Sequence, residues 1–328
     1  MKLSTKIMQK QQYIVAFVAV IFLMSIYLLT PGDGSYWLQY WWMFPIAFMV
    51  ALMVNTAGIS GASLFVPFFI LIFPLITGIS LAPIDTVKLG LITESFGLSS
   101  SALAFLSFGL VDTTLASRAI VRAIPFVIVG VFFVFLIPKS VLYVIVAVLL
   151  LLAVFLMRYE RVLKQRRIES SKLDDINESV PDGEQVTITS KDKKRYTYCR
   201  TKSGAKKRFI GYGLGGVFQG AAGFGIGELG IISMILTKIP TRIAIGTSHF
   251  IVATTAIVAS IIHFILASSL SGGSFPWNIP FMTVPAVILG GQLAPYVAAK
   301  LSSKYLERFV SILFIIIAFA LFSITLNF

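Results

Sequence analysis

The sequence predicts an all-α polytopic membrane protein with two inverted repeats of about five membrane segments each, preceded by an N-terminal helix. Of its 328 residues, 57% are hydrophobic and only 12% are charged, whereas soluble domains carry about 25% charged residues. The charges are concentrated, because residues 158–208 contain 15 of the 27 Lys and Arg residues and 8 of the 14 Asp and Glu residues. Glycine-rich turns recur at corresponding places before and after this segment. A lipid bilayer is the solvent that suits such a chain.

The net charge of +13 is explained by the membrane rather than by nucleic acid. Residues 158–208 contribute +7 of it (15 − 8), and most of the remainder flanks apolar stretches, as the positive-inside rule describes. We therefore expect the lipid bilayer as a partner and no nucleic acid. The single cysteine, Cys199, cannot form an internal disulfide, and no metal-ligand spacing is present, so we expect no metal and no cofactor. A homo-oligomer remains open.

Four parts follow one another along the chain. Residues 1–38 have a basic start and an apolar run without a cleavage pattern after it, which indicates a retained N-terminal transmembrane helix with an outer loop. Repeat 1 occupies residues 39–157, a basic linker residues 158–208, and repeat 2 residues 209–328. A helix that crosses the bilayer needs about 20 residues. The apolar stretches that we expect to be membrane segments are 12–30, 38–57, 61–78, 86–108, 118–137, 140–157, 209–224, 226–238, 242–269, 279–299 and 305–327.

The basic residues predict the orientation in the cell membrane. The N-terminus and the 158–208 linker should both be cytoplasmic, and six segments between them allow this, which leaves the C-terminus outside. The same order places Arg118 and Arg122 inside, and only Lys139 falls on the disfavoured side. Lys88 is expected to extend its amine to the outer surface. His263 is expected at the outer interface.

The two halves share three landmarks in the same order, which predicts an internal repeat. Because the first half enters from outside and the second from inside, the repeats are inverted, a common plan among secondary transporters. The corresponding pairs are residues 58–63 with 223–228, 83–90 with 239–246, and 124–130 with 284–290.

The linker between the repeats contains two different patterns. Residues 169–183 are polar and are predicted to be disordered. Residues 186–189 and 195–200 flank a polar turn, which indicates a small β-hairpin. A basic linker that lies on anionic lipid headgroups and a specific partner site both fit this composition.

The glycine-rich turns are the strongest candidates for a binding site. Each separates two short or glycine-interrupted apolar segments, so we expect broken helices whose ends approach the middle of the membrane. Free N–H groups and the positive dipole end at each new helix start favour an anion, and serine hydroxyls can add donors. Close helix packing through small residues is the alternative explanation. The candidate substrate-binding residues here are Gly58, Ser60, Gly61, Ser63, Gly223, Gly225 and Gly227.

A second polar group lies near the start of a later apolar segment. Thr247 and Ser248 are candidate substrate ligands, and His249 is a candidate for proton coupling or gating. Thr and Ser side chains also commonly bond to the carbonyl four residues earlier, and a lone His is often satisfied by packing. Both explanations stay open for this group.

Two carboxylates lie well inside apolar stretches, and an intramembrane carboxylate is by default a functional residue. Glu228 either pairs, for example with His249, and couples a proton to transport, or caps a helix start. Glu94 either faces solvent or belongs to a buried polar pair. Asn55 and Gln219 precede the two glycine turns by similar distances and are expected to line the same cavity.

The residues Gly223-Phe224-Gly225-Ile226-Gly227-Glu228, with Gly246-Thr247-Ser248 eighteen residues later, resemble the TauE/SafE family. The resemblance covers about residues 40–157 and 209–328. Members of this family are membrane exporters of sulfite and organosulfonates. The resemblance implies a transporter rather than an enzyme, which exports a small anion by alternating access around a midplane site at the two turns. An inside-negative potential contributes about 2.3 kcal/mol per charge per 100 mV, so a uniporter would already expel anions.

Two other functions fit parts of the sequence. Glu94 and Glu228 are also compatible with a transporter or channel for another small solute, such as a carboxylate or a cation. The pattern Gly58-Ile59-Ser60-Gly61 matches that of an intramembrane serine protease, for which His249 or His263 would have to supply the base.

Overall fold

A computed structural model describes residues 11–171, 183–270, 275–300 and 303–326. Among these residues, eight helices are long and apolar enough to cross a membrane, and Ala62–Thr77 and Ile226–Leu236 form shorter apolar helices. Every apolar stretch predicted as a membrane segment is helical. The chain is therefore an all-α polytopic membrane protein, as the sequence predicted. Most of the stretch predicted to be disordered, 169–183, lies outside the described residues.

The helices follow one another with short connections. In the first half they are α2 (Gln11–Leu29), α3 (Gly34–Leu38), α4 (Met43–Ala57), α5 (Ala62–Pro67), the π-helical η1 (Phe68–Ile72), α6 (Phe73–Thr77), α7 (Pro83–Ser107), α8 (Thr113–Val134) and α9 (Lys139–Ser171). The strands β1 (Gly183–Thr189) and β2 (Arg195–Thr201) come next. The second half contains α10 (Lys202–Ala222), α11 (Ile226–Leu236), α12 (Thr241–Leu270), α13 (Asn278–Lys300) and α14 (Ser303–Leu326).

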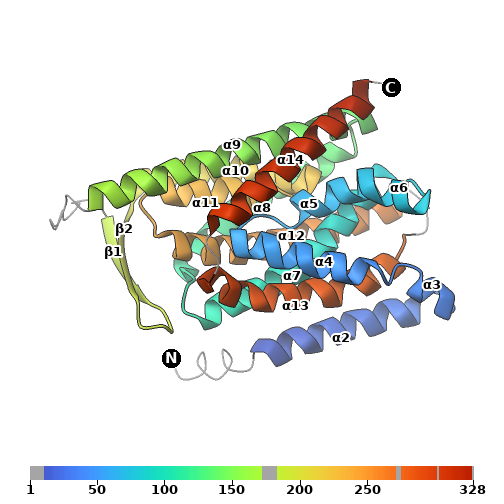
Figure 1. The fold of residues 1–328 in the computed structure, drawn as a ribbon, viewed down its shortest axis with the longest axis horizontal. Helices are drawn as coiled ribbons and strands as arrows, with labels where there is room; N and C mark the ends of the chain where they lie inside the picture. Colours follow the sequence, from blue (N-terminus) through green and yellow to red (C-terminus); the bar gives the residue numbers. More distant parts are fainter. Residues whose placement is uncertain (1–10, 172–182, 271–274, 301–302, 327–328) are drawn as a thin grey trace.

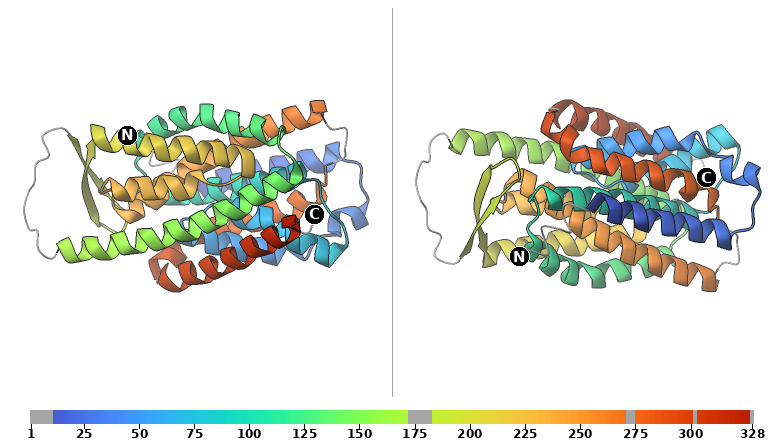
Figure 2. Two further views of the ribbon diagram at one scale, coloured as in Figure 1. Left: turned by 90° about the horizontal axis from the view of Figure 1, so that it is seen from above. Right: turned by 90° about the horizontal axis from the view of Figure 1, so that it is seen from below.

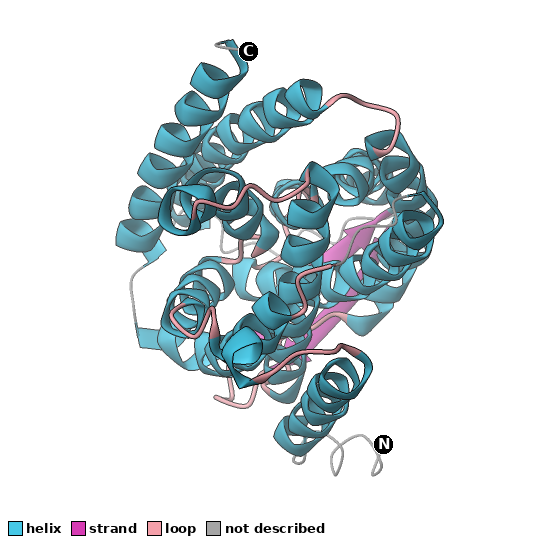
Figure 3. Ribbon diagram, turned by 90° about the vertical axis from the view of Figure 1, so that its right-hand side faces the viewer, coloured by secondary structure: helices cyan, strands magenta, loops and turns pink. Residues whose placement is uncertain are grey.

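The long helices lie side by side along one direction, as Figure 1 shows, and Figure 3 views them end-on. Helix α4 packs on α13, and α10 packs on α8. Helices α7 and α12 pack on each other in the centre, while α9 and α14 form a pair at one side. Helix α2 lies at the periphery, against α7 and α13.

Two pairs of elements, called here the re-entrant pairs, each enter the bundle from one end and return to that same end. Helix α10 and helix α11 form one pair, because Arg208 near the start of α10 donates a hydrogen bond to Thr237 just after α11, at 2.8 Å. Helix α4 and the α5–η1–α6 segment form the other, because the Tyr40 ring just before α4 lies 5.2 Å from the Phe73 ring of α6. Figure 1 shows that the first pair opens toward the end with the β-hairpin and the second toward the opposite end.

Glycines allow α8 and α10 to touch along their backbones. A Cβ atom on Gly130 would lie 2.0 Å from the Val217 carbonyl oxygen, and one on Gly220 would lie 2.1 Å from the Val127 carbonyl oxygen. No larger residue fits at such distances. Small residues at helix contacts are the usual way in which membrane helices approach each other.

The outer surface of the bundle is apolar. Leu28 on α2 is 74% exposed, Phe319 on α14 is 65% exposed, and Val121 on α8 is 72% exposed. Such extensive exposed apolar area is not tolerated by soluble monomers and marks a lipid-facing surface. The exposed side chains therefore agree with the membrane assignment that helix length and composition support.

The hydrophilic segment 158–208 contains the last turns of α9, the β-hairpin and the first turns of α10. Strands β1 and β2 pair antiparallel, with Thr187 opposite Thr197, in the region where the sequence predicted a hairpin. The hairpin lies across one end of the helices, called here the hairpin end (Figure 2). There Lys191 N–H donates to the Phe108 carbonyl oxygen at 2.9 Å, and Arg242 pairs with Asp192 at 3.1 Å.

Two predictions about single polar residues are wrong. Lys88 does not reach the surface, because it is 5% exposed, its amine lies 2.6 Å from the Asp85 carboxylate, and it also lies over the Phe275 ring. His263 is not interfacial, because it is fully buried and its Nε2 lies 2.8 Å from the Gly220 carbonyl oxygen. Lys88 is thus paired with Asp85 of its own helix, while His263 contacts a carbonyl oxygen of α10.

Candidate functional site

The first glycine-rich turn, residues 58–61, separates α4 from α5. Gly58 ends α4 in the left-handed conformation with φ of 79°, and its N–H bonds to the Val54 carbonyl oxygen. A Cβ atom at this position would be strained and would lie 3.0 Å from the Ile245 side chain. Ser60 and Gly61 then lead into α5, which begins at Ala62. Glycine is thus required for the chain to reverse here.

The second turn, residues 223–225, separates α10 from α11. Gly223 also ends its helix in the left-handed conformation, with φ of 87°, and its N–H bonds to the Gln219 carbonyl oxygen. Gly225 has φ of 131° and precedes the first residue of α11. Gly227 lies in the first turn of α11. The helix interruptions therefore occur at the glycines that the sequence singled out.

The two turns lie against each other, although 168 residues separate Ser60 in the first turn from Glu228 just after the second. Ser60 N–H in the first turn donates to Glu228 Oε1 at 3.2 Å, while Gly225 N–H in the second turn donates to Glu228 Oε2 at 3.1 Å. A Cβ atom on Gly227 would lie 3.5 Å from the Ser60 nitrogen. A single carboxylate thus accepts hydrogen bonds from the backbone of both turns.

Glu94 on α7 contacts the same place from another direction. The Ser60 hydroxyl donates to Glu94 Oε1, and Gln219 Nε2 donates to Glu94 Oε2 at 2.8 Å. Ala62 N–H lies 3.5 Å from Glu94 Oε1. Glu94 is 2% exposed and Glu228 is 8% exposed. Of the two alternatives for Glu94, the structure shows the buried polar group and not the solvent-facing one, and Ser60 connects the two carboxyl groups.

Other predicted residues of the turns have local roles. The Ser63 hydroxyl donates to the Ser60 carbonyl oxygen at 2.6 Å, which holds the first turn of α5. Asn55 donates to the Ala51 carbonyl oxygen at 2.8 Å, and its Oδ1 has no partner among the described residues. Asn55 and Glu94 line one small cavity beside the first turn. Gln219 instead belongs to the Glu94 hydrogen-bond group.

The Thr247–His249 group is divided between two locations. Ser248 lies near the second turn, with its hydroxyl 3.4 Å from the Gly227 carbonyl oxygen. Thr247 Oγ1 accepts a hydrogen bond from Asp112 N–H at 2.9 Å, at the hairpin end of the bundle. His249 Nδ1 lies 3.0 Å from the Ser101 hydroxyl. Thr247 therefore does not face the turns.

The histidines do not pair with the groups that the sequence suggested. Glu228 is held by the turn amides and not by His249, whose Nε2 has no hydrogen-bond partner among the described residues. Ser60 bonds to Glu94, His249 to Ser101, and His263 to the Gly220 carbonyl oxygen. The contact between Ser60 and a histidine that the protease mechanism requires is thus not formed in the part of the chain that the structure describes.

Several functional neighbours were not identified from the sequence. Ser101 contacts His249, and Asp112 joins Thr247 to the β-hairpin through its own contacts with Tyr198 and Arg200. Asp112 precedes Thr113-Thr114 and is followed three residues later by an apolar residue, so a helix N-cap signal was present in the sequence. Nothing in the local sequence identifies its distant partners.

The small cavities beside the turns show a closed arrangement. One, of about 20 Å³, is lined by Gly58, Glu228 and neighbouring apolar residues. Another, of about 10 Å³, is lined by Gly225 and Glu228 with residues of α9. One water molecule requires about 10–15 Å³, so each cavity is about the size of a single water molecule. The turns are therefore packed together in this conformation.

A comparison with protein families assigns the chain to one of them. Residues 43–321 match the family model described as Sulfite exporter TauE/SafE. Searches of curated proteins and of solved structures each found no match. Members of the matched family are transporters of sulfite and related anions, and the matched range includes both glycine turns, both carboxylates and the hydrophilic segment 158–208. The chain therefore belongs to the TauE/SafE sulfite exporter family.

Proposed function

We propose that the protein exports a small anion, sulfite or an organosulfonate, by alternating access around the two glycine turns. Family membership supports transport of sulfite or a related anion. The observation that carries the proposal for the site is the pair of hydrogen bonds that Ser60 N–H and Gly225 N–H donate to one carboxylate. Two backbone donors from opposite turns therefore already converge on a single carboxyl group.

In this proposal, Glu228 stands in for the substrate when the site is closed. Sulfite and sulfonates, like a carboxylate, present several oxygen acceptors on a small anionic group. Free N–H groups at helix starts bind such groups well. The substrate would replace the Glu228 carboxylate at the two amides, with the Ser60 hydroxyl as a further donor. Glu228 would then move aside, ionised or with a proton.

The closed packing of the turns supports alternating access. The cavities of about 20 and 10 Å³ beside Glu228 leave no room for a sulfur oxyanion with its oxygens. Entry from either side therefore requires the turns to separate. We propose that the two re-entrant pairs move relative to each other, so that each turn is exposed to one side of the membrane in succession.

We further propose that the halves are inverted repeats, with 39–157 as repeat 1, 209–328 as repeat 2 and 158–208 as the linker. The helix contacts support this. In this scheme each helix of repeat 1 has a counterpart in repeat 2: α4 corresponds to α10, α7 to α12, α8 to α13, and α9 to α14. When each helix is replaced by its counterpart, the α4–α13 contact becomes the α10–α8 contact. The central α7–α12 and lateral α9–α14 contacts convert into themselves. The two re-entrant pairs open toward opposite ends, as inverted repeats require.

The proposed orientation places the hairpin end in the cytoplasm and the C-terminus outside, in the cell membrane. Helix α2 runs away from the hairpin end, and α14 finishes at the opposite end (Figure 1). The exposed basic residues of the hairpin segment support this assignment through the positive-inside rule. With that orientation, an inside-negative potential drives anion export at about 2.3 kcal/mol per charge per 100 mV.

A small carboxylate is the second candidate substrate, and one observation favours it. The turn amides bind a carboxylate, that of Glu228, in this structure. A substrate with the same group would make the same two hydrogen bonds. Competition separates the candidates: excess sulfonate would inhibit sulfite flux in a sulfur oxyanion exporter, while a small carboxylate would inhibit more strongly in a carboxylate transporter.

Efflux of sulfite from proteoliposomes under a clamped potential tests the proposal. We would compare the wild type with Gly227→Val, because a larger side chain there enters the space next to the Ser60 nitrogen without a strained backbone. Gly34→Val is the matched control, because nothing lies within 4 Å of its added Cβ. Potential-driven efflux that is lost in Gly227→Val and kept in Gly34→Val supports the site. Absence of sulfite, sulfonate and carboxylate flux in folded wild-type protein would refute it.

A further inference from the structure

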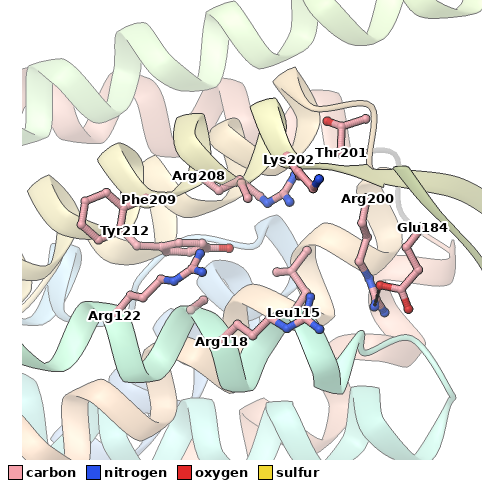
Figure 4. A pocket seen from close by; sticks show the side chains of 12 residues that line it. Leu115, Arg118, Arg122, Glu184, Arg200, Thr201, Lys202, Arg208, Phe209 and Tyr212 are labelled. Atoms are coloured by element: carbon pink, nitrogen blue, oxygen red, sulfur yellow. Dashed lines mark hydrogen bonds and ion pairs between the residues drawn. The ribbon is translucent and has the colours of Figure 1, made fainter. Parts of the chain in front are cut away.

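A pocket at the hairpin end has no role in the transport site described above. It has a volume of about 140 Å³ and lies between α8, α10 and the end of β2 (Figure 4). The wall from α8 carries Arg118 and Arg122, the wall from α10 carries Arg208 and Tyr212, and Arg200 reaches it from β2. The glycine turns do not contribute to its lining.

The pocket concentrates positive charge. Arg118 and Arg122 are one helical turn apart on α8, so both project from the same face, where like charges destabilise an isolated helix. Among the described residues, neither forms an ion pair or a hydrogen bond with another side chain. Glu184 is the one carboxylate that lines the pocket, and it is paired with Arg200 at 3.1 Å. The charges of Arg118 and Arg122 are therefore left without a counter-ion from the described chain.

Arg208 strengthens this point because it is buried. It is 6% exposed, and it donates a hydrogen bond to the Thr237 hydroxyl at 2.8 Å. In the described residues, no carboxylate pairs with it. A buried guanidinium with an uncharged partner is costly, whereas an anion in the pocket would compensate its charge.

We propose that this pocket binds a phosphate group, supplied by an anionic lipid headgroup or by a free phosphate. The planar guanidinium groups of Arg118, Arg122 and Arg208 present paired N–H donors, and phosphate oxygens accept such pairs well. Pockets for drug-sized ligands have volumes of about 300–1,000 Å³. At about 140 Å³, this pocket is smaller, so it suits a single phosphate headgroup and not a nucleotide.

The surroundings explain how a lipid would reach the pocket. Phe209 lines it and is 41% exposed, and next to it on α10 Ile210 is 61% exposed. On α8, Val121 beside Arg122 is 72% exposed. Exposed apolar side chains next to a basic pocket between membrane helices form a surface for acyl chains below a bound headgroup. A free phosphate would need only the arginines.

A bound phosphate would also tie the hairpin to both halves of the bundle. Arg118 and Arg122 belong to the first half, Arg208 to the second, and Arg200 to the hairpin. The proposal does not depend on the transport assignment, because it is tested by binding and stability and not by flux.

The test uses the full chain and the double variant Arg118→Gln/Arg122→Gln, because both side chains are exposed and can be replaced without disturbing the core. Lys206→Gln/Lys207→Gln is the matched control, since it removes two exposed charges from α10 that do not line the pocket. Vesicles of phosphatidylcholine with and without phosphatidic acid probe the lipid source, and inorganic phosphate probes the free ion. Bound lipid is measured by native mass spectrometry, and phosphate by the shift in thermal unfolding.

For a lipid, we expect phosphatidic acid to bind the wild type and the lysine control equally, and the arginine variant about tenfold or more weakly. For a free phosphate, the arginine variant should need about tenfold or more inorganic phosphate than the wild type for the same rise in unfolding temperature. Equal binding by the wild type and the arginine variant, or an equal loss in the lysine control, would overturn the proposal. Binding of neither probe to the wild type would overturn it as well.

Discussion

Arg200 on β2 donates two hydrogen bonds to Asp112 at the start of α8, from Nη2 to Oδ1 at 2.6 Å and from Nε to Oδ2 at 2.8 Å. The Asp112 side chain also accepts from Leu115 N–H, which caps α8, and from the Tyr198 hydroxyl. Its own N–H bonds to Thr247 on α12. One buried aspartate therefore connects the β-hairpin to helices from both halves of the chain.

Asp112→Ala should release the hairpin from the helix ends. Removing one partner of a buried ion pair typically costs about 3–5 kcal/mol, so local opening becomes at least about a hundredfold more frequent. Cys199, the single cysteine, lies on β2 beside Arg200 and is partly buried. Its rate of labelling by a maleimide in detergent measures the opening directly. Asp192→Asn is the control, since the Asp192–Arg242 pair is exposed and screened by solvent, so that it should contribute little. Equal labelling rates in both variants would contradict this role for Asp112.

Hairpin docking should weaken at high pH through Tyr198. Burial, and then its hydrogen bond to Asp112, raise the pKa of the Tyr198 phenol above its ordinary value of 10.0. Because the folded state holds this proton more tightly, the stabilisation is complete below about pH 10 and is lost as the pH rises toward the folded-state pKa. Limited proteolysis of the hairpin over an alkaline series should show the loss in the wild type, while Tyr198→Phe should lack this pH dependence. Identical profiles would exclude Tyr198 as the cause.

Glu228→Gln should tighten substrate binding and slow transport. Glutamine has a single side-chain oxygen, so it cannot accept from both Ser60 N–H and Gly225 N–H as the Glu228 carboxyl group does, and a buried donor left without a partner costs about 1–3 kcal/mol. A competing anion should therefore bind about tenfold or more tightly, with a lower KM for efflux and a lower kcat because release is slower. Glu228→Gln with a raised KM would show that the carboxylate assists substrate binding instead of occupying its place. A pH-dependent rate that disappears only in this variant would add proton coupling.

Thr247→Val should leave the KM for substrate unchanged, because Thr247 contacts Asp112 and not the turns. Valine has nearly the same shape but cannot accept the hydrogen bond from Asp112 N–H, so we expect a loss of about 1–3 kcal/mol in local stability. Maleimide labelling of Cys199 should become faster. A large increase in KM without a change in the labelling rate would show that Thr247 binds the substrate.

Gly220→Ala should prevent normal packing of α10 on α8. The added Cβ would lie 2.1 Å from the Val127 carbonyl oxygen, which is backbone and cannot move aside without displacing the helix. We expect destabilisation of about 1–3 kcal/mol or more, seen as a lower Tm or as aggregation on size-exclusion chromatography in detergent. Gly34→Ala should behave as the wild type, since its Cβ meets nothing within 4 Å. A fully stable Gly220→Ala protein would show that the two helices are farther apart.

Much of the helical framework was predictable because the bilayer leaves few choices to the backbone. An apolar run of sufficient length must be helical there, since its N–H and C=O groups find no water, and the helices α7 and α12 appear where these runs occur. The glycines at 58 and 223 marked helix ends because both adopt positive φ, which glycine accepts without strain. The alternating pattern at 186–189 and 195–200 indicated the hairpin.

The partners of the polar side chains were decided only by the tertiary structure. Glu228 could cap a helix or pair with His249 as far as local sequence shows, and its bond to Ser60 depends on how two re-entrant pairs meet across 168 residues. Lys88 was expected at the surface, but it is buried, paired with Asp85 on its own helix and placed over the Phe275 ring of another segment. Hydropathy establishes that a segment crosses the membrane, whereas the rotation and contacts of each helix depend on side-chain packing against all its neighbours at once. For that reason the sequence could name the residues of the candidate site but not the groups that each of them holds.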